Sequence, residues 1–211
     1  MTKTAEAPQA LVIKAPNLQT VLVRITGKTP YMQHRFSKKA EIMAKQQEGS
    51  TGKGKKKHAA RDFEADFVAA QHKSADGWFG IPAPAFRAAL ISACRLVGFQ
   101  MTKAKLSVFV ESDGECERDG TPLVRLMAAA PEMSTLAVRN ETGVVDIRAR
   151  PLWRKWGADV RLMYDADQFT VTDVVNLLMR AGLQVGIGEG RPDSKKSAGM
   201  GYGLFTVEQS A

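Results

Sequence analysis

The chain has 211 residues, of which 44% are hydrophobic and 25% are charged, which fits one globular domain with insertions. No apolar run approaches the roughly 20 residues that span a bilayer, and the N-terminal residues lack the pattern of a signal peptide. Cys94 and Cys116 are the only cysteines and show no metal-ligand spacing, so we expect a cytoplasmic protein with no metal, no other cofactor and no membrane partner.

The positive charge is concentrated in one segment. The formal net charge is +8, and the stretch from Arg35 to Lys57 holds eight Lys and Arg residues against two Glu residues, so it carries +6. Such a concentration is expected of a protein that binds a polyanion. Residues 37–60 include the run EGSTGKGKKKH, which has too little apolar surface to order itself, and we predict a flexible basic insertion there.

In chain order, residues 1–16 are expected to form a flexible leader before one domain over 17–211. The β-branched, alternating run Thr20–Thr26 predicts the first strand, which residues 27–30 end. After the basic insertion, Asp62–Val68 is expected to form a short strand. A helix is predicted to begin near Pro84 and to end before Gly98, with Phe86, Leu90 and Cys94 on one apolar face.

The second half alternates strands with one further helix. Strands are predicted over 105–111, 123–129 and 158–164, and 134–150 reads as a hairpin that turns at 140–143, within an extra β-hairpin region at about 112–157. Thr170 and Asp173 have capping-box spacing and open the second helix, which Gly182 is expected to cap. A last strand follows over 203–207. The order predicts an α+β fold with a split βαβ, ferredoxin-like or RRM-like antiparallel sheet and two main helices.

A glycine-rich loop lies between the second helix and the last strand. Six of the 18 glycines fall within residues 185–203, and glycine lets the backbone approach a ligand closely. Successive N–H groups could then cradle phosphate oxygens beside basic side chains. The spacing matches neither a Walker loop nor a dinucleotide fingerprint. The candidate contacts are Gly188, Gly190, Arg191, Lys195 and Lys196.

These flanks, read together, resemble the RAMP superfamily. The C-terminal part reads helix, G-x-G, basic insert, G-x-G-Y-G and strand, which is similar to the terminal motif of that superfamily. The run from Gly80 to Arg95 resembles its first-helix motif, although Ala83 replaces a glycine and Pro84 and Ala85 replace serines. The first strand with Gly27 and the Thr29-Pro30 pair is a third, weaker likeness.

The resemblance implies an RRM-like fold and a role like that of the CRISPR-associated subunits that coat guide RNA. It implies sequence-independent contacts to the RNA backbone, several copies along one RNA, and neighbouring effector subunits as partners. Phosphate contacts give affinity and register without base information. The further residues that we assign to phosphate contact are Arg24, Arg35, Lys38, Lys39, Lys53, Lys55, Lys56, Lys57 and Arg87.

Aromatic residues flank the basic segment and could stack on bases or anchor the core. These are Tyr31, Phe36, Trp78 and Phe79. Trp153 and Trp156 have cationic neighbours, which suits nucleic acid or a subunit contact. Asp165 and Asp167 are expected to form a turn with helix-start charge.

Three functions stay open at this point. The first is a non-catalytic RNA-binding subunit. The second is a metal-independent endoribonuclease of the same fold, with His34 as general base and binding residue, because ribonucleases of this superfamily often use a His after the first strand. No Asp occurs between Met1 and Arg61, so the Asp-dependent target cleavage of some backbone subunits is not supported. The third is a phage or mobile-element protein that binds single-stranded DNA.

Overall fold

A computed structural model describes residues 13–35, 62–139, 145–194 and 198–208 of the chain. Its largest sheet is antiparallel and has the strand order β10-β1-β9-β4. The strands are β1 (Leu18–Gly27), β4 (Val108–Glu111), β9 (Gly157–Asp165) and β10 (Phe205–Val207). β1 is central and pairs with β9 from Leu18↔Asp165 to Thr26↔Gly157.

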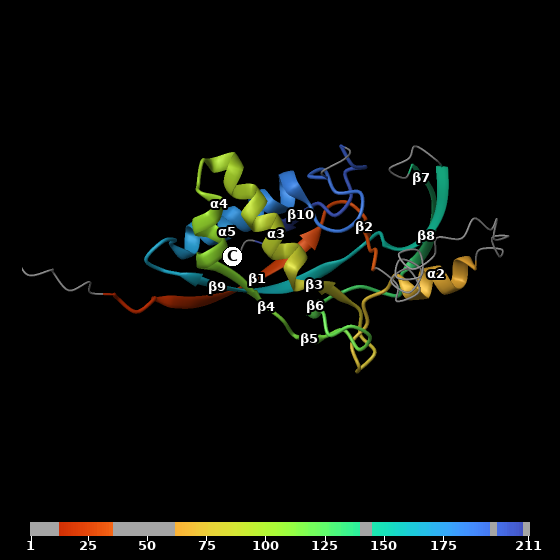
Figure 1. Cartoon of the computed structure of the whole chain (residues 1–211), viewed down its shortest axis with the longest axis horizontal. Coiled ribbons are helices and arrows are strands. Elements are labelled where there is room, and N and C mark those ends of the chain that lie inside the picture. Colours follow the sequence, from red (N-terminus) through yellow and green to blue (C-terminus); the bar gives the residue numbers. More distant parts are fainter. Residues whose placement is uncertain (1–12, 36–61, 140–144, 195–197, 209–211) are drawn as a thin grey trace, which may run out of the picture.

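Two helices cover one face of this sheet (Figure 1). They are α3 (Ala83–Ala93), which continues as a 3₁₀ turn over Cys94–Val97, and α5 (Val171–Arg180). The alternate residues of β9 are buried, as the period of a half-covered strand requires. The core between the layers includes Val23, Ile25, Phe86, Leu90, Cys94, Val160, Leu162, Val174 and Leu178.

The connectivity repeats one pattern twice. α3 lies between β1 and β4 in the chain, and α5 lies between β9 and β10. The α+β class, the antiparallel sheets and both main helices are therefore as the sequence predicted. The capping box is also confirmed: the backbone N–H of Asp173 donates to Thr170 Oγ1 at 3.2 Å, and that of Thr170 donates to Asp173 Oδ2 at 3.0 Å.

Two smaller sheets extend the domain. One has the order β2-β8-β7, from β2 (Tyr31–Met32), β8 (Val145–Trp153) and β7 (Glu132–Arg139), and the other has the order β3-β6-β5, from β3 (Gly80–Pro82), β6 (Pro122–Arg125) and β5 (Gly114–Glu115). β7 and β8 form the predicted hairpin, whose turn lies outside the described residues. In Figure 1 this hairpin extends beyond the helical layer, beside α2 (Phe63–Ala69).

The strand expected at Asp62–Val68 is wrong, because this segment forms α2. Asp62 is its N-cap, and its side chain accepts a hydrogen bond from the backbone N–H of Ala65 at 3.0 Å. Glu64 and Asp66 lie in the first turn, where acidic groups stabilise the positive end of the helix dipole. A cap at the first residue favours the helix over the weak alternation seen in the sequence.

The strand predicted over 105–111 is half wrong. Residues Met101–Ser107 form the helix α4, and only Val108–Glu111 are extended. Ala104 and Ser107 are buried whereas Leu106 is exposed, which is a helical spacing. The strand expected over 123–129 also ends early, at Arg125.

Gly182 does not cap α5. A π-type turn, Ala181–Val185, follows the helix, and the chain leaves it at Gly186, where φ is +74°. A Cβ on Gly182 would lie 2.4 Å from the carbonyl oxygen of Phe205. This glycine is therefore needed for close packing against β10.

Aromatic packing joins the sheets. Tyr31 lies between Trp153 and Trp156, with ring centroids 5.6 and 5.4 Å away, and all three side chains are buried. The ring nitrogen of Trp156 donates to the carbonyl oxygen of Thr29 at 2.8 Å. None of the helices in the described ranges combines the length and apolarity that crossing a bilayer requires.

Candidate nucleic-acid interface

A groove separates the start of α3 from the glycine-rich loop, residues 186–203. Two adjoining pockets of about 610 and 290 Å³ form it, and Ala85, Gly188 and Arg191 line both. The larger pocket follows α3 as far as Arg95, and the smaller one opens beside β2 at His34. This α3 groove therefore brings together three segments that are distant in the sequence and that each contributed a predicted contact.

Glycines let the loop lie directly on the segment around β2. Gly188 has a φ of +79°, and a Cβ there would lie 2.4 Å from the carbonyl oxygen of Met32. Gly203 has a φ of +69°, and a Cβ there would lie 1.8 Å from the carbonyl oxygen of Ile187. Both positions exclude a side chain by conformation and by space.

The first residues of the loop include both paired and unpaired backbone amides. Ile187 N–H donates to the Gly203 carbonyl at 3.0 Å, and Glu189 N–H donates to the Met32 carbonyl at 2.9 Å. The amides of Gly188, Gly190 and Arg191 have no acceptor within the described part of the chain. Glu189 therefore interrupts the expected run of successive N–H groups, while Gly188 on one side and Gly190 with Arg191 on the other keep amides that can donate to an anion.

A charged cluster surrounds His34. Arg150 on β8 is buried and donates from Nε to Glu189 Oε2 at 2.7 Å, and the same oxygen lies 3.9 Å from His34 Nδ1. Burial lowers the pKa of His34, Arg150 and Arg148 lower it further, and Glu189 partly offsets them. A neutral imidazole at pH 7 follows from this environment.

A second histidine reaches the same pocket. His72 follows α2 and lines the smaller pocket with His34, Gln33 and Tyr31. Gln33 fixes this corner: its Oε1 accepts from the backbone N–H of His72 at 2.9 Å, and its Nε2 donates to the Gly80 carbonyl at 2.8 Å. Burial lowers the pKa of His72 to about 4, so this ring is also neutral at pH 7.

The far end of the groove is held by a contact between α3 and the loop. Asp193 accepts hydrogen bonds from Ser92 and from Arg95, the latter at 2.8 Å. Arg191 Nη1 donates to the Gly188 carbonyl at 3.0 Å and remains half-buried on the groove wall. The loop is therefore tied to both walls before any ligand binds.

Three of the predicted phosphate contacts, Arg24, Arg35 and Arg87, do not line the groove. Arg24 is on the sheet face opposite the helices and forms a two-bond ion pair with Asp159 at 2.7 and 2.8 Å. Arg35 is buried and donates to Asp119 and to the Ala69 carbonyl at 2.9 and 3.1 Å. The buried Arg35 therefore supports the fold and has little surface left for phosphate, whereas the exposed Arg24 is paired with an acidic residue away from the groove.

Arg87 points away from the groove, toward β4. Its Nε donates to the Val108 carbonyl at 3.2 Å, and its guanidinium also bonds the Lys105 carbonyl and lies 5.1 Å from the ring centroid of Phe109. It therefore ties α3 to α4 and β4. The predicted lysine contacts Lys38, Lys39, Lys53, Lys55, Lys56, Lys57, Lys195 and Lys196 lie outside the described residues.

The aromatic candidates divide into core and partly exposed residues. Tyr31, Trp153 and Trp156 are buried, so they anchor the core and are unavailable for stacking. Trp78 and Phe79 are half-buried, with Arg125 over the Trp78 ring at 6.0 Å. Phe36 lies outside the described residues.

The acidic turn before α5 forms as predicted. The backbone N–H of Asp167 donates to Asp165 Oδ1 at 3.0 Å, and Asp167 pairs with Lys14 at 2.8 Å. The pair thus closes a turn and holds the chain that leads into β1.

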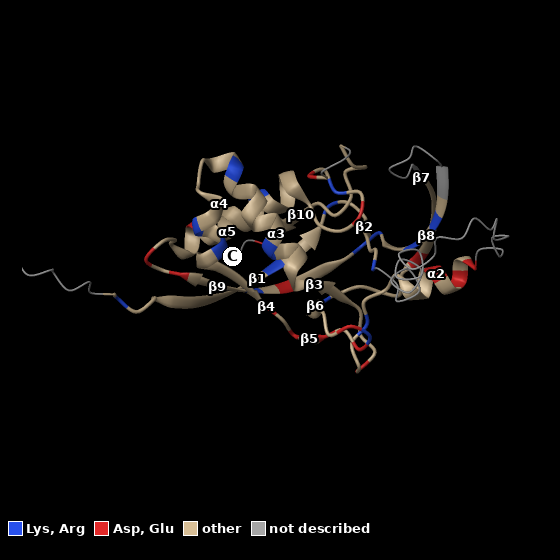
Figure 2. Cartoon of the chain, viewed as in Figure 1, with Lys and Arg blue, Asp and Glu red and all other residues tan. Residues whose placement is uncertain are grey.

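Charges are mixed over the described surface. Figure 2 shows basic residues spread over the helices and along β8, with acidic residues on α2 and near β5. Within the described residues the lining of the groove carries Arg95 and Arg191 against Glu189 and Asp193, and the buried Arg150 pairs with Glu189 from outside the lining. Most of the surplus charge therefore belongs to the basic insertion.

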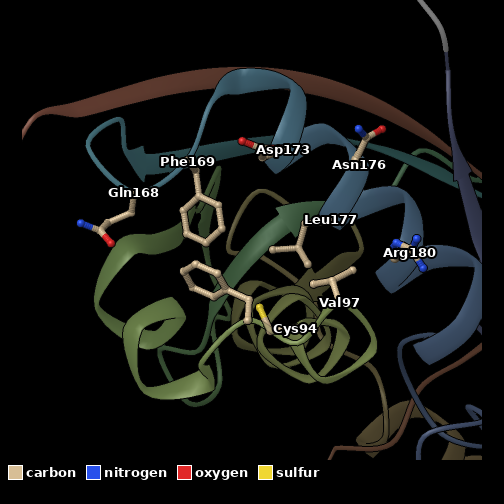
Figure 3. A pocket seen from close by; sticks show the side chains of 9 residues that line it. Cys94, Val97, Gln168, Phe169, Asp173, Asn176, Leu177 and Arg180 are labelled. Carbon is tan, nitrogen blue, oxygen red and sulfur yellow. The ribbon is translucent and has the colours of Figure 1, made fainter.

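A third pocket, of about 330 Å³, lies between the end of α3 and α5 (Figure 3). Phe99 and Phe169 pack with centroids 4.7 Å apart along its wall, and the buried thiol of Cys94 is beside them. Its one basic residue, Arg180, bonds Gln184 at 3.5 Å. Its lining pairs apolar side chains with Gln168, Asp173 and Asn176, and it carries none of the glycines that line the α3 groove.

Sequence reasoning missed Arg150, Glu189 and His72. Arg150 lies in a strand between Ala149 and Pro151, where a buried charge has no distinct pattern, and its partner is 39 residues away.

The search with the whole sequence found no matching family model and no matching curated protein.

Proposed function

We propose that this chain is a non-catalytic, sequence-independent RNA-binding subunit with an RRM-like (ferredoxin-like) core of the RAMP superfamily type. In this proposal several copies assemble along a guide RNA in a CRISPR-type effector ribonucleoprotein in the cytoplasm, with other effector subunits beside them. The observation that carries it is the α3 groove, where the unpaired amide of Gly188 lies beside Arg191.

The sheet order supports the fold assignment. A split βαβ fold has two β-α-β halves whose strands interleave into one antiparallel sheet. The order β10-β1-β9-β4, with α3 and α5 on one face, has this arrangement. The smaller sheets and the basic insertion are then additions to the core.

The groove chemistry supports backbone recognition. Unpaired amides and guanidinium groups donate to phosphate oxygens without reading bases. The predicted RNA-binding residues His34, Gly188 and Arg191 line this groove, and Gly190 lies between two of its lining residues, Glu189 and Arg191. A ligand held by such donors is a sugar-phosphate chain of any sequence.

Equilibrium binding of labelled single-stranded RNA and DNA of equal length tests the proposal. We expect RNA to bind more tightly, and Arg191→Glu to weaken binding by about 10-fold, which corresponds to roughly 1.4 kcal/mol for a charge-assisted contact. Arg180→Glu is the matched control, because it changes the same charge on α5 outside the groove. Equal effects of the two substitutions would remove the groove from the proposal, and tighter DNA binding would favour the DNA-binding alternative.

A metal-independent endoribonuclease is the second candidate, and one observation favours it. His34 and His72 line one pocket, and a neutral imidazole can act as the general base that removes the proton of a ribose 2′-hydroxyl. RNA incubated with a metal chelator should be cleaved by wild type and not by His34→Ala in this case. Intact RNA with wild type would leave the binding function alone.

A further inference from the structure

We propose that His72, Cys116 and Asp119 form a binding site for a divalent transition metal ion of the zinc type. One ligand atom from each residue, an imidazole nitrogen, a sulfur and a carboxylate oxygen, lies within 4.8 Å of the other two. Nitrogen, thiolate and carboxylate are the ligands that Zn²⁺ takes in proteins. The inference is independent of RNA binding.

The backbone builds the site from two segments. Cys116 and Asp119 are three residues apart in the turn between β5 and β6, where the Gly120 N–H donates to the Cys116 carbonyl at 2.8 Å and Gly120 has a φ of +67°. Ligands separated by two residues are the usual half-site of a zinc centre. An isolated bridge between Ser74 and Cys116 brings this turn to the segment after His72.

A separate observation points to an absent partner. His72 exposes only 6% of its surface, and its Nδ1 is buried with no hydrogen-bond partner within the described residues. A buried polar atom without a partner costs about 1–3 kcal/mol. A metal ion bound by this ring would supply the electrostatic partner that the protein does not.

The environments of Cys116 and Asp119 allow both residues to bind a metal ion together with a water molecule. Cys116 exposes 2% of its surface and is free of disulfide bonding, and Asp119 accepts hydrogen bonds from Arg35 and from the Thr121 N–H at 2.9 and 3.1 Å. Hydrogen bonds of this kind orient a ligating carboxylate. Coordination releases the thiol proton of Cys116 to solvent, and Asp119 lies on the exposed side, where water can complete four-coordination.

The site would join the loop after α2 to the β5–β6 turn. His72 also lines the pocket that contains His34, so one ring is shared between the ion site and the α3 groove. The sequence gives no indication of this site, because His72 precedes Cys116 by 44 residues and the third ligand is an aspartate.

Titration of the metal-free full-length chain with Zn²⁺ and Co²⁺ tests the proposal. We expect one equivalent of each ion to bind, with a thiolate-to-cobalt charge-transfer band and a higher melting temperature with Zn²⁺. Cys116→Ser should remove the band and weaken Zn²⁺ binding by at least about 10- to 100-fold. Cys94→Ser, at the other buried cysteine, should leave both unchanged.

Asp119→Asn is a second ligand variant that keeps the shape of the side chain, and because it removes the charged partner of the buried Arg35, its folding is checked by circular dichroism before the titration. It should weaken Zn²⁺ binding while the circular dichroism spectrum of the metal-free protein stays unchanged. Wild-type protein that binds neither ion, or a cobalt spectrum without a thiolate band, would overturn the proposal. So would full Zn²⁺ affinity in both ligand variants.

Discussion

Arg150 on β8 and Glu189 in the glycine-rich loop form an ion pair of 2.7 Å, with side-chain exposures of 7% and 23%. Arg150 belongs to the β2-β8-β7 sheet and Glu189 to the loop that leads to β10, and Glu189 also lies 3.9 Å from His34. The pair therefore fixes the loop against the hairpin and sets the electrostatic environment of the groove.

Removing the acidic partner should be costly. Glu189→Gln leaves the Arg150 charge buried without compensation, so we expect the free energy of unfolding to fall by about 3 kcal/mol. Chemical denaturation measures it. The exposed pair Arg154–Glu132, with exposures of 66% and 57%, gives the control Glu132→Gln, for which we expect a change below about 1 kcal/mol. Similar losses in the two variants would contradict the structural role of the pair.

A comparison of two glycines in the same loop distinguishes the effect of close packing on stability from the effect of backbone conformation. Gly188 and Gly201 both have positive φ, +79° and +72°, but a Cβ meets Met32 at 2.4 Å in the first and nothing within 4 Å in the second. Each alanine variant should lose about 1–2 kcal/mol of stability from conformation. Gly188→Ala should lose more and should also weaken RNA binding. Equal stability and equal binding in the two variants would show that the loop does not need to lie on β2.

The contact between α3 and the loop should depend on acid pH. The hydrogen bond from Ser92, with help from Arg95, holds the pKa of Asp193 below its ordinary value against a smaller opposing effect of burial. A lowered pKa in the folded state stabilises the fold above the unfolded pKa of about 3.9, and this stability is lost as the pH falls through the folded value. Asp193→Asn should therefore be less stable than wild type at pH 7, and the difference should shrink below about pH 4. Denaturation curves at pH 3 and pH 7 measure it, and a difference that is independent of pH would contradict the assignment.

The basic insertion should govern the salt dependence of binding. If Lys55, Lys56 and Lys57 contact phosphates of single-stranded RNA, reversing their charges should reduce the slope of log affinity against log salt by up to about 2. Binding curves at several salt concentrations give the slope. Arg180→Glu is the control. An unchanged slope in the triple variant would show that these lysines do not contact the RNA.

Periodicity and caps predicted the two central strands of the main sheet and the two helices that cover it, whereas half of the segment predicted to form β4 is helical. Alternation identified β1 and β9, and the Thr170 and Asp173 pair identified the start of α5. The segments that failed were short. The helix α2 depends on one capping contact of Asp62. The helix α4 depends on which of its side chains are buried by the neighbouring elements, and this tertiary packing cannot be read from the sequence.

The site was predictable only where it depends on backbone chemistry. The glycines marked the loop that lines the groove, because their spacing reports backbone conformation directly. The charged contacts were not predictable, because the residue type alone does not show whether an arginine such as Arg35 or Arg87 is bonded within the fold or exposed on the surface. His72 and Glu189 reach the groove only through tertiary packing.

Arg35 immediately precedes residues 36–61. Its Nε donates a hydrogen bond to the carbonyl oxygen of Ala69, at the end of α2, which is the helix that follows them. This hydrogen bond therefore holds together the two described segments that flank residues 36–61. Doubling the length of a loop between fixed stems changes the closure free energy by only roughly 0.6 kcal/mol. We therefore expect the domain to keep its architecture when the segment between these two positions is lengthened or shortened.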